Sequence, residues 1–244
     1  MNHGLYIAAA GMKSRAQALE VSANNVANAG VAGYKRDMVF YGIFNRVRGN
    51  PLERALADSV VAEESRTNFS AGTLQRTDNP LDLALASDGF FAVQTGEGVS
   101  YTRNGQFTLD ANRRIVSAAG EPLLNENNRP IILPEGQVEV GSLGDVSVDG
   151  VLAGRIQIVD FQDKAQLVKA GSVLFQAPQG AEPLPPENLS VKQGFLERSN
   201  VNPVAGLADA MHNMRTFEML ARAMRMMSQD VDRRAIDEIA RVNA

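Results

Sequence analysis

Few residues of this 244-residue chain carry the chemistry of a catalytic site. The two histidines, His3 and His212, lie near opposite ends of the sequence, and neither has the spacing that gathers metal ligands or a base-orienting carboxylate. Asp78 and Asp82 are a candidate carboxylate pair for glycoside cleavage, but sequence spacing does not set the distance between two carboxylates. Phosphate-loop, nucleophile-elbow and dinucleotide-binding motifs are absent. We therefore expect no catalytic residues, no metal and no cofactor.

Composition narrows the class of protein further. The hydrophobic content of 44% predicts a folded body, and the formal net charge of −4 offers no basic field for nucleic acid or anionic lipid. The chain has no cysteine, so its state does not change between reducing and oxidising compartments. Neither a secretory signal peptide nor an apolar run long enough to span a membrane is expected.

The first 28 residues have the periodicity of a helix. Apolar residues recur at steps of three or four, averaging 3.5, which is the spacing of a coiled-coil seam. The members of this row are Leu5, Ala8, Met12, Ala16, Leu19, Ala23 and Val26. The alternative interpretation is a helix buried within its own domain.

A second periodic segment covers residues 204–241. Its row also averages 3.5 residues per step and consists of Leu207, Met211, Met214, Phe217, Ala221, Met224, Ser228, Val231 and Ala235. Methionine is frequent here, which suits packing against surfaces of slightly different shape, although it also fills ordinary cores.

Between the two helices the pattern changes to short apolar runs separated by turn residues, which predicts an antiparallel β-rich domain. Asp149-Gly150 is the strongest hairpin signal. The predicted fold class is α+β, with terminal heptad helices forming a coiled-coil region around an inserted β domain. The expected segments are an N-terminal helix and turn (1–36), an extended or irregular connector (37–74), the β domain (75–196) and a C-terminal helix (197–244).

This arrangement favours an assembly protein over a monomeric enzyme. A helix of about three heptads is marginal in water unless its apolar face is packed. The terminal helices should therefore pair with each other or with other subunits.

Four segments resemble the flagellar rod and hook family, and together they span nearly the whole chain. Residues 22–36 resemble its N-terminal motif, in which an Asn-rich helix end precedes a Gly-aromatic-basic turn. Residues 79–94 and 101–107 are similar to the beginning of its central β domain, and residues 193–202 to the segment before its C-terminal helix. One such motif occurs by chance, whereas four in family order, between two heptad helices, are hard to explain otherwise.

The resemblance and the two heptad rows together name the candidate site residues. The family-motif residues are Gly33, Tyr34, Lys35, Arg36, Pro80, Leu81, Asp82, Ser199, Asn200, Val201 and Asn202. The predicted subunit-interface residues are Leu5, Met12, Leu19, Asn24, Asn25, Val26, Asn28, Met214, Phe217, Met224 and Val231. A polar residue among Ser199, Asn200 and Asn202 is expected to cap the C-terminal helix.

The resemblance implies a structural subunit of the flagellar basal-body rod, more like the proximal-rod than the distal-rod type. Such a subunit would be exported without a cleaved signal peptide through the flagellar type III apparatus and would polymerise, with itself and other rod subunits, into a hollow periplasmic shaft that transmits torque. No nucleic-acid partner and no membrane insertion are implied. The alternatives are a distal-rod subunit, a non-rod assembly scaffold and, as the enzyme alternative, a peptidoglycan hydrolase using Asp78 or Asp82.

Overall fold

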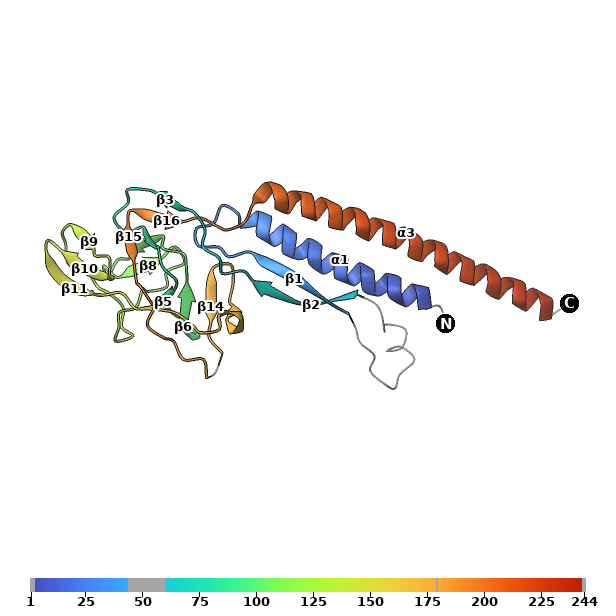
Figure 1. Ribbon diagram of the computed structural model, residues 1–244, viewed down its shortest axis with the longest axis horizontal. Helices are drawn as coiled ribbons and strands as arrows, with labels where there is room; N and C mark the ends of the chain where they lie inside the picture. Colours follow the sequence, from blue (N-terminus) through green and yellow to red (C-terminus); the bar gives the residue numbers. More distant parts are fainter. Residues whose placement is uncertain (1–2, 44–59, 179, 243–244) are drawn as a thin grey trace. The chain divides into compact units, whose positions relative to one another are not determined.

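The computed structural model describes residues 3–43, 60–178 and 180–242 of the chain (Figure 1). Its contacts divide the chain into two compact units. Unit 1 contains residues 1–27, 37–66 and 202–244, and unit 2 contains residues 28–36 and 67–201. The sequence therefore passes between the units at four peptide bonds, after residues 27, 36, 66 and 201.

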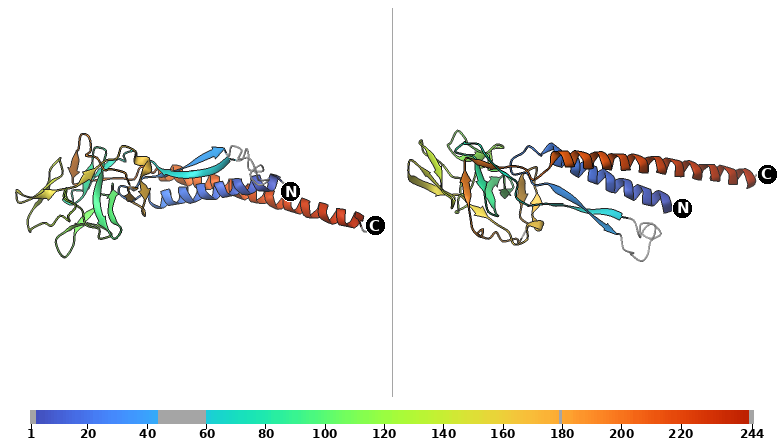
Figure 2. Two further views of the ribbon diagram at one scale, coloured as in Figure 1. Left: turned by 90° about the horizontal axis from the view of Figure 1, so that it is seen from below. Right: turned by 45° about the horizontal axis from the view of Figure 1, so that its top comes forward.

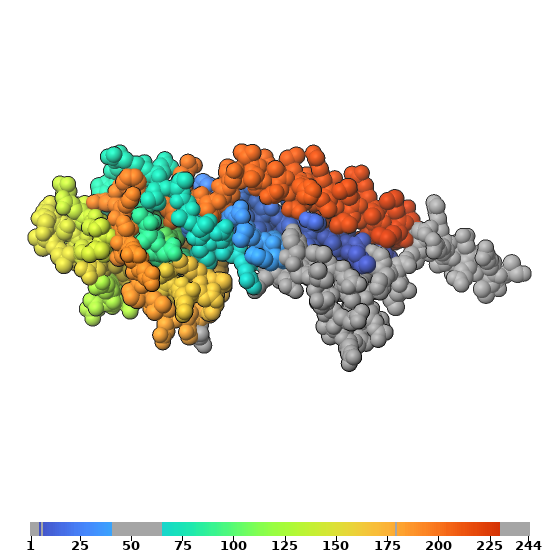
Figure 3. Space-filling view, viewed as in Figure 1, coloured from blue at the N-terminus to red at the C-terminus, as the bar shows by residue number. Residues whose placement is uncertain are grey.

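Unit 1 is built on two long helices, α1 (His3–Ala27) and α3 (Pro203–Val242). They lie side by side in each view (Figures 1 and 2), and the surface of α3 runs along α1 in the space-filling view (Figure 3). Gly11 faces Leu220, Arg15 donates to Asn213 at 3.2 Å, and Val26 faces Gly206. Residue numbers rise along one helix as they fall along the other, so the pair is antiparallel.

The face of α3 that packs on α1 has a regular heptad spacing. One row of partly or fully buried residues follows alternating steps of four and three: Gly206, Ala210, Asn213, Phe217, Leu220, Met224 and Met227. Thr216, Ala221 and Ala223 beside this row are also partly buried. Small residues permit close approach, because a Cβ added at Gly206 would lie 2.8 Å from Cγ2 of Val26. The predicted pairing of the terminal helices with each other is therefore observed, while knobs-into-holes packing is not established by these contacts.

The rows expected from periodicity agree only in part with the residues that are buried in unit 1. On α3, Phe217, Ala221 and Met224 of the expected row are partly buried, whereas Leu207, Met211 and Met214 are exposed. On α1 most of the expected row is partly or fully buried, and its exposed members are Ala16 and Ala23. Two apolar rows lie next to each other on each helix, and periodicity alone does not tell which one meets the partner helix.

Unit 1 also contains a two-stranded sheet of β1 (Asp37–Ile43) and β2 (Val60–Thr67), with β1 in contact with α1. The sequence predicted only extended or irregular chain here, and the pairing of the two strands was not foreseen. Over its described residues, neither long helix contains an apolar stretch suited to crossing a bilayer.

Unit 2 is antiparallel throughout its described strand pairs. Its five-stranded sheet has the order β12-β5-β6-β14-β13 and contains β5 (Phe90–Thr95), β6 (Gly98–Thr102), β12 (Ile158–Val159), β13 (Val168–Lys169) and β14 (Leu174–Gln176). A three-stranded sheet has the order β11-β10-β9 and contains β9 (Val138–Val140), β10 (Asp145–Val148) and β11 (Val151–Arg155).

Three smaller sheets and one short helix complete unit 2. The paired strands are β4 (Leu83–Leu85) with β15 (Val191–Gln193), β3 (Leu74–Arg76) with β16 (Phe195–Glu197), and β7 (Phe107–Leu109) with β8 (Ile115–Ser117). The 3-10 helix η1 (Lys164–Gln166) is capped by Asp163.

The core of unit 2 lies on both faces of β5. Side chains alternate along a strand, so Phe91 and Val93 join one cluster, while Phe90 and Ala92 join the other. The second cluster is rich in aromatic rings, with the centroids of Phe90 and Phe175 5.9 Å apart in an edge-on arrangement. Residues 90–93 of β5 are therefore buried on both faces of the sheet, whereas Gln94 near the end of the strand is exposed.

The turn chemistry follows the sequence at one predicted site and departs from it at another. Asp149 and Gly150 have φ values of 51° and 79°, as a type I′ hairpin between β10 and β11 requires. Asn104-Gly105 has the sequence that predicts a type I′ turn, but neither residue has a positive φ, so that prediction is wrong. Gly105 is needed because a Cβ there would lie 1.6 Å from the carbonyl oxygen of Leu83.

The apolar runs 131–133 and 156–161 form less strand than such runs predict. Burial alternates at Ile131, Ile132 and Leu133 as in a strand, but the described pairing there is only an isolated bridge between Ile132 and Arg114. The run 156–161 is reduced to β12.

We predict that the same Leu→Ala substitution lowers the free energy of unfolding by very different amounts at two positions of unit 2. Leu123→Ala removes a fully buried side chain and should lower the free energy of unfolding by about 2–5 kcal/mol. Leu152→Ala, at a position 65% exposed, should change it by less than about 0.5 kcal/mol. Urea denaturation followed by near-ultraviolet circular dichroism measures both, and equal losses would contradict this core assignment.

Candidate functional site: a polar node of the family-motif segments

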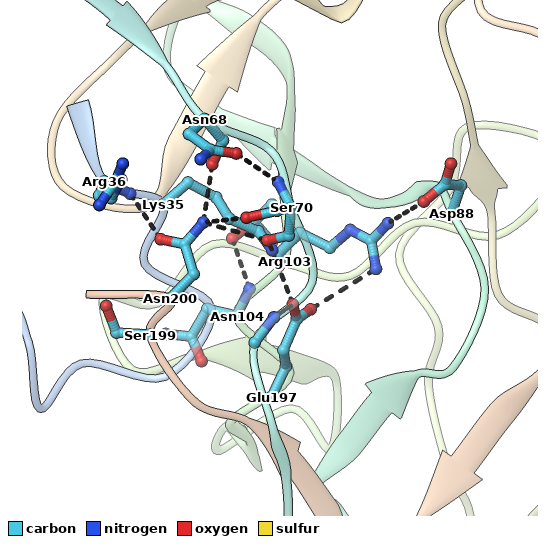
Figure 4. Close-up of polar contacts among 12 residues, drawn as sticks. Lys35, Arg36, Asn68, Ser70, Asp88, Arg103, Asn104, Glu197, Ser199 and Asn200 are labelled. Atoms are coloured by element: carbon cyan, nitrogen blue, oxygen red, sulfur yellow. Dashed lines mark hydrogen bonds and ion pairs between the residues drawn. The ribbon is translucent and has the colours of Figure 1, made fainter. Parts of the chain in front are cut away.

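Three segments that lie close in sequence to the passages between units are joined by a group of polar side chains within unit 2. We call this group the polar node and define it as Lys35, Arg36, Asn68, Ser70, Arg103, Glu197 and Asn200 (Figure 4). Arg36 and Asn200 were predicted from the family motifs, and so was Lys35.

The carboxylate of Glu197 is the centre of the node. Its side chain is 1% exposed, and Oε1 accepts from Nζ of Lys35 at 2.6 Å and from the backbone N–H of Gly72 at 2.7 Å. Oε2 lies 3.5 Å from Nη1 of Arg103, whose side chain is 4% exposed. In Figure 4 the guanidinium of Arg103 lies between Glu197 and Asp88. One carboxylate thus joins residues from four distant parts of the sequence.

The amide of Asn200 joins the same segments through neutral hydrogen bonds. Its Oδ1 accepts from the backbone N–H of Arg36 at 2.8 Å, and its Nδ2 donates to the carbonyl of Asn68 at 2.8 Å and to that of Ser70 at 3.1 Å. The backbone N–H of Asn68 donates in turn to the carbonyl of Arg36 at 2.8 Å. The three segments therefore form a closed ring of hydrogen bonds.

The turn that carries Lys35 is held closely against the β sheet. Gly33 has a φ of 68°, its N–H donates to the carbonyl of Glu197, and a Cβ there would lie 2.3 Å from the backbone carbon of Arg103. Tyr34 is buried beneath the ammonium of Lys169, which lies 4.2 Å from the ring centroid and donates to the carbonyl of Lys35 at 2.9 Å. Neither Asn28 nor Gly30 adopts a left-handed conformation, and Gly33 has the one positive φ between residues 28 and 36.

Burial dominates the electrostatics of the node. Desolvation lowers the pKa of Lys35 below its ordinary 10.5, although the adjacent Glu197 carboxylate offsets part of this effect. Desolvation likewise lowers the pKa of Arg103, again against the attraction of Glu197. Two cations therefore compete for one buried carboxylate.

Within unit 1, Asn25 makes a matching contact next to the turn in sequence. Its Oδ1 accepts from the N–H of Asp37 at 2.9 Å and its Nδ2 donates to the carbonyl of Asp37 at 2.8 Å. This two-point bond joins the end of α1 to the start of β1. Asn25 was predicted as an interface residue, and its side chain is occupied within the chain.

The remaining family-motif residues have local structural contacts. Asn202 caps α3, since its Oδ1 accepts from the N–H groups of Val204 and Ala205. Ser199 accepts from the N–H of Val201. The segment of Pro80, Leu81 and Asp82 is held by its neighbours, and its bonds include Gln193 to the carbonyl of Pro80, Leu81 to Asn79, and Asn79 to Asp82.

The predicted interface residues lie in varied surroundings. Those partly buried are Leu5, Met12, Leu19, Val26, Asn28, Phe217 and Met224. Asn24 and Met214 are exposed, and the side chain of Val231 lies outside the described part of α3. Their role toward other subunits is taken up below as a proposal.

The residues considered for catalysis do not form a common site. Asp78 is 71% exposed and pairs with Arg76 at 2.6 Å, whereas Asp82 is buried and accepts from Asn79. His212 is exposed on α3. Among the described residues, no cluster of three or more potential metal ligands was found.

Sequence reasoning missed several members of the node. Glu197 and Arg103 lie inside motifs that were recognised, but nothing in the sequence marked them as partners of Lys35. Asn68 and Ser70 lie in the stretch expected to be irregular. The local sequence shows that Asn68 and Ser70 flank Phe69, which does not predict their hydrogen bonds with Asn200.

Comparison with known proteins gives this architecture a family. Profiles described as "Flagella basal body rod protein", "Flagellar hook protein FlgE/F/G D1 domain" and "Flagellar basal body rod FlgEFG protein C-terminal" match residues 5–35, 84–148 and 192–237. Terminal segments of rod type flanking a central domain of hook and rod type define a structural protein of the bacterial flagellum. The chain belongs to the flagellar basal-body rod proteins and is most like those of the FlgF type.

Three relatives illustrate the similarity. FlgF of Caulobacter vibrioides is 29% identical over 100% of both chains, and FlgF of Mesorhizobium japonicum is 30% identical over 95% of this chain and 96% of its own. FlgG of Bacillus subtilis is 32% identical over 83% of this chain and 86% of its own. The FlgF relatives thus match over more of the chain, which favours the proximal-rod type.

We predict that removing either charge of the Lys35–Glu197 ion pair has unequal effects on stability. Glu197→Gln leaves Lys35 and Arg103 buried without a counter-charge and should lower the free energy of unfolding by about 3–5 kcal/mol. Lys35→Met leaves the Arg103 and Glu197 pair balanced, and should cost at most about 2 kcal/mol. Urea denaturation monitored by tyrosine circular dichroism compares them. A loss in Lys35→Met equal to that in Glu197→Gln would contradict the charge argument.

Gly33 should be far less tolerant of a methyl group than Gly30. Gly33→Ala combines a positive φ with a backbone collision, so it should cost more than about 2 kcal/mol of unfolding free energy. Gly30→Ala meets no atom within 4 Å and should change stability by less than about 1 kcal/mol. Thermal denaturation of both variants checks this, and a well-tolerated Gly33→Ala would show that the turn is not constrained as described.

Proposed function

We propose that this chain is a proximal-rod subunit that polymerises through its terminal helices into the hollow shaft of the flagellar rod. Its partners are other rod subunits and further copies of itself. The protein transmits torque and performs no chemistry of its own. It acts in the periplasmic part of the basal body, which it reaches through the flagellar type III export apparatus without a cleaved signal peptide.

The observation that carries this proposal is a second apolar row on α3, which α1 leaves uncovered. Val204, Leu207, Met211 and Met214 follow at steps of three, four and three, and their exposed fractions are 78%, 56%, 45% and 46%. An exposed apolar row with heptad spacing can pack against a further helix as in a coiled coil, and apolar patches of this kind mark protein interfaces. The packed row and the free row together equip α3 to join two helices at once.

The subunit-interface role of the N-terminal residues has separate support. Ile7 on α1 is 47% exposed, and the partly buried Leu5 and Met12 lie near it in sequence. Leu19 is partly buried and continues the row that periodicity assigns to an interface, whereas Val26 packs against Gly206 within the chain. A coiled-coil region formed by several subunits uses both rows on each helix.

The test of position is to label the protein in purified basal bodies and locate it along the rod by electron microscopy. Density in the membrane-proximal rod is expected. Density in the distal rod would retain the structural role and replace the subtype, as the relative of FlgG type suggests. Absence from the basal body would overturn the proposal in favour of a transient assembly scaffold.

The test of mechanism places a charge in the free row. Met211→Asp should abolish incorporation into rods and motility, because a carboxylate would be buried in an apolar seam, while the monomer keeps its fold. His212→Asp introduces the same charge at the next residue, outside the row, and should assemble normally. Swimming assays and rod purification compare the two, and normal motility of Met211→Asp would refute the seam.

A further inference from the structure

The polar node does not end at the buried residues but continues to the surface as an alternating row of charges. Nζ of Lys35 lies 2.6 Å from Glu197, Glu197 3.5 Å from Arg103, and Arg103 3.8 Å from Asp88. Asp88 then pairs with Lys164 at 2.9 Å, and Lys164 with Asp160 at 3.3 Å. We call these six residues the ion-pair chain; all belong to unit 2.

The buried members of the ion-pair chain carry a net positive charge, which the exposed Asp88 can balance. Lys35 and Arg103 contribute two positive charges and Glu197 one negative charge, and all three side chains are at most 4% exposed. Asp88 is the next carboxylate along the ion-pair chain, and its side chain is 71% exposed. A net charge in a buried site is costly, so the electrostatic balance of the node depends on a residue at the surface.

We propose that Asp88 is a surface control point of a conformational device, which sets how firmly the turn at residues 33–36 and the segment at 197–200 are held together. When Asp88 is charged and turned toward Arg103, the two buried cations are balanced and both segments stay closed on Glu197. When Asp88 is neutralised or drawn away, Lys35 and Arg103 share one carboxylate, and their uncompensated charge raises the free energy of the closed node relative to its open state. No residue of this device needs to contact another subunit.

Lys164 competes with Arg103 for the same carboxylate. Oδ2 of Asp88 lies 2.9 Å from Lys164, while Oδ1 lies 3.8 Å from Arg103. The carboxylate also borders a surface hollow that contains Asp160, Asp163 and Glu187. A change in the charges of this hollow therefore reaches the node mainly through Asp88, to which the charge of Asp160 adds a weaker influence on Arg103.

Two backbone amides report directly on the state of the node. The N–H of Gly72 donates to the Glu197 carboxylate at 2.7 Å, and the N–H of Gly33 donates to the Glu197 carbonyl at 2.7 Å. The N–H of Leu123 donates to the carbonyl of Ile115 at 2.8 Å within the core, away from the ion-pair chain, and reports on general opening of unit 2. Hydrogen exchange of these three amides separates local from global effects.

The experiment is amide hydrogen exchange by nuclear magnetic resonance on the full chain at low ionic strength. Asp88→Asn should accelerate exchange at Gly33 and Gly72 about two- to fivefold, with no change at Leu123. Glu187→Gln removes the same charge from the same hollow without touching Arg103, and should leave all three rates unchanged. Lys164→Met frees Asp88 for Arg103 and should slow exchange at Gly33 and Gly72.

Salt supplies an independent readout. Because the link at Asp88 is exposed, the difference between Asp88→Asn and the unaltered chain should shrink when ionic strength rises to about 1 M, where screening acts over about 3 Å. Unchanged rates in Asp88→Asn would overturn the proposal. So would an equal acceleration in Glu187→Gln, or an acceleration that includes Leu123.

Discussion

The burial of one carboxylate is the constraint on which the arrangement of unit 2 depends. Glu197 accepts hydrogen bonds through its side chain and its backbone carbonyl from Lys35, Gly72 and Gly33, and it faces Arg103. An ionised carboxylate is tolerated in a site this dry only if its partners are all in place. These partners come from three different segments, so satisfying the charge also fixes where the turn at residues 33–35, the stretch at residue 72 and the strand β16 lie.

The two helices of unit 1 are constrained in a different way, by the size of their side chains. Gly206 and Ala210 allow α3 to approach α1, and Gly11 does the same from the other helix. Because the packed row begins with the small residues Gly206 and Ala210, the larger apolar residues of the neighbouring row, from Val204 to Met214, stay at the surface. Internal pairing and external assembly thus use different rows of the same helix.

The sequence predicted the class of fold and the outer elements, because these follow from local patterns. Helical periodicity located α1 and α3, and Asp149-Gly150 located the β10 and β11 hairpin, since left-handed turns have few substitutes for glycine. The helix row that packs internally was not predictable, because two apolar rows with equal periodicity differ only in residue size. Lys35, Arg36 and Asn200 were identified as motif residues, but 162 positions separate Lys35 from Glu197, and no local rule pairs them.

The polar node restricts the positions of the turn at residues 33–36 and the segment at 197–200 more narrowly than an apolar contact would. An apolar cluster tolerates small shifts in register, whereas the bonds of Asn200 and Glu197 are lost when a segment moves by an ångström or two. A buried ion pair contributes little net stability, and in some proteins it serves to exclude alternative arrangements. In a rod subunit that property matters more than extra stability, because any slack between these segments of unit 2 would be repeated in every copy.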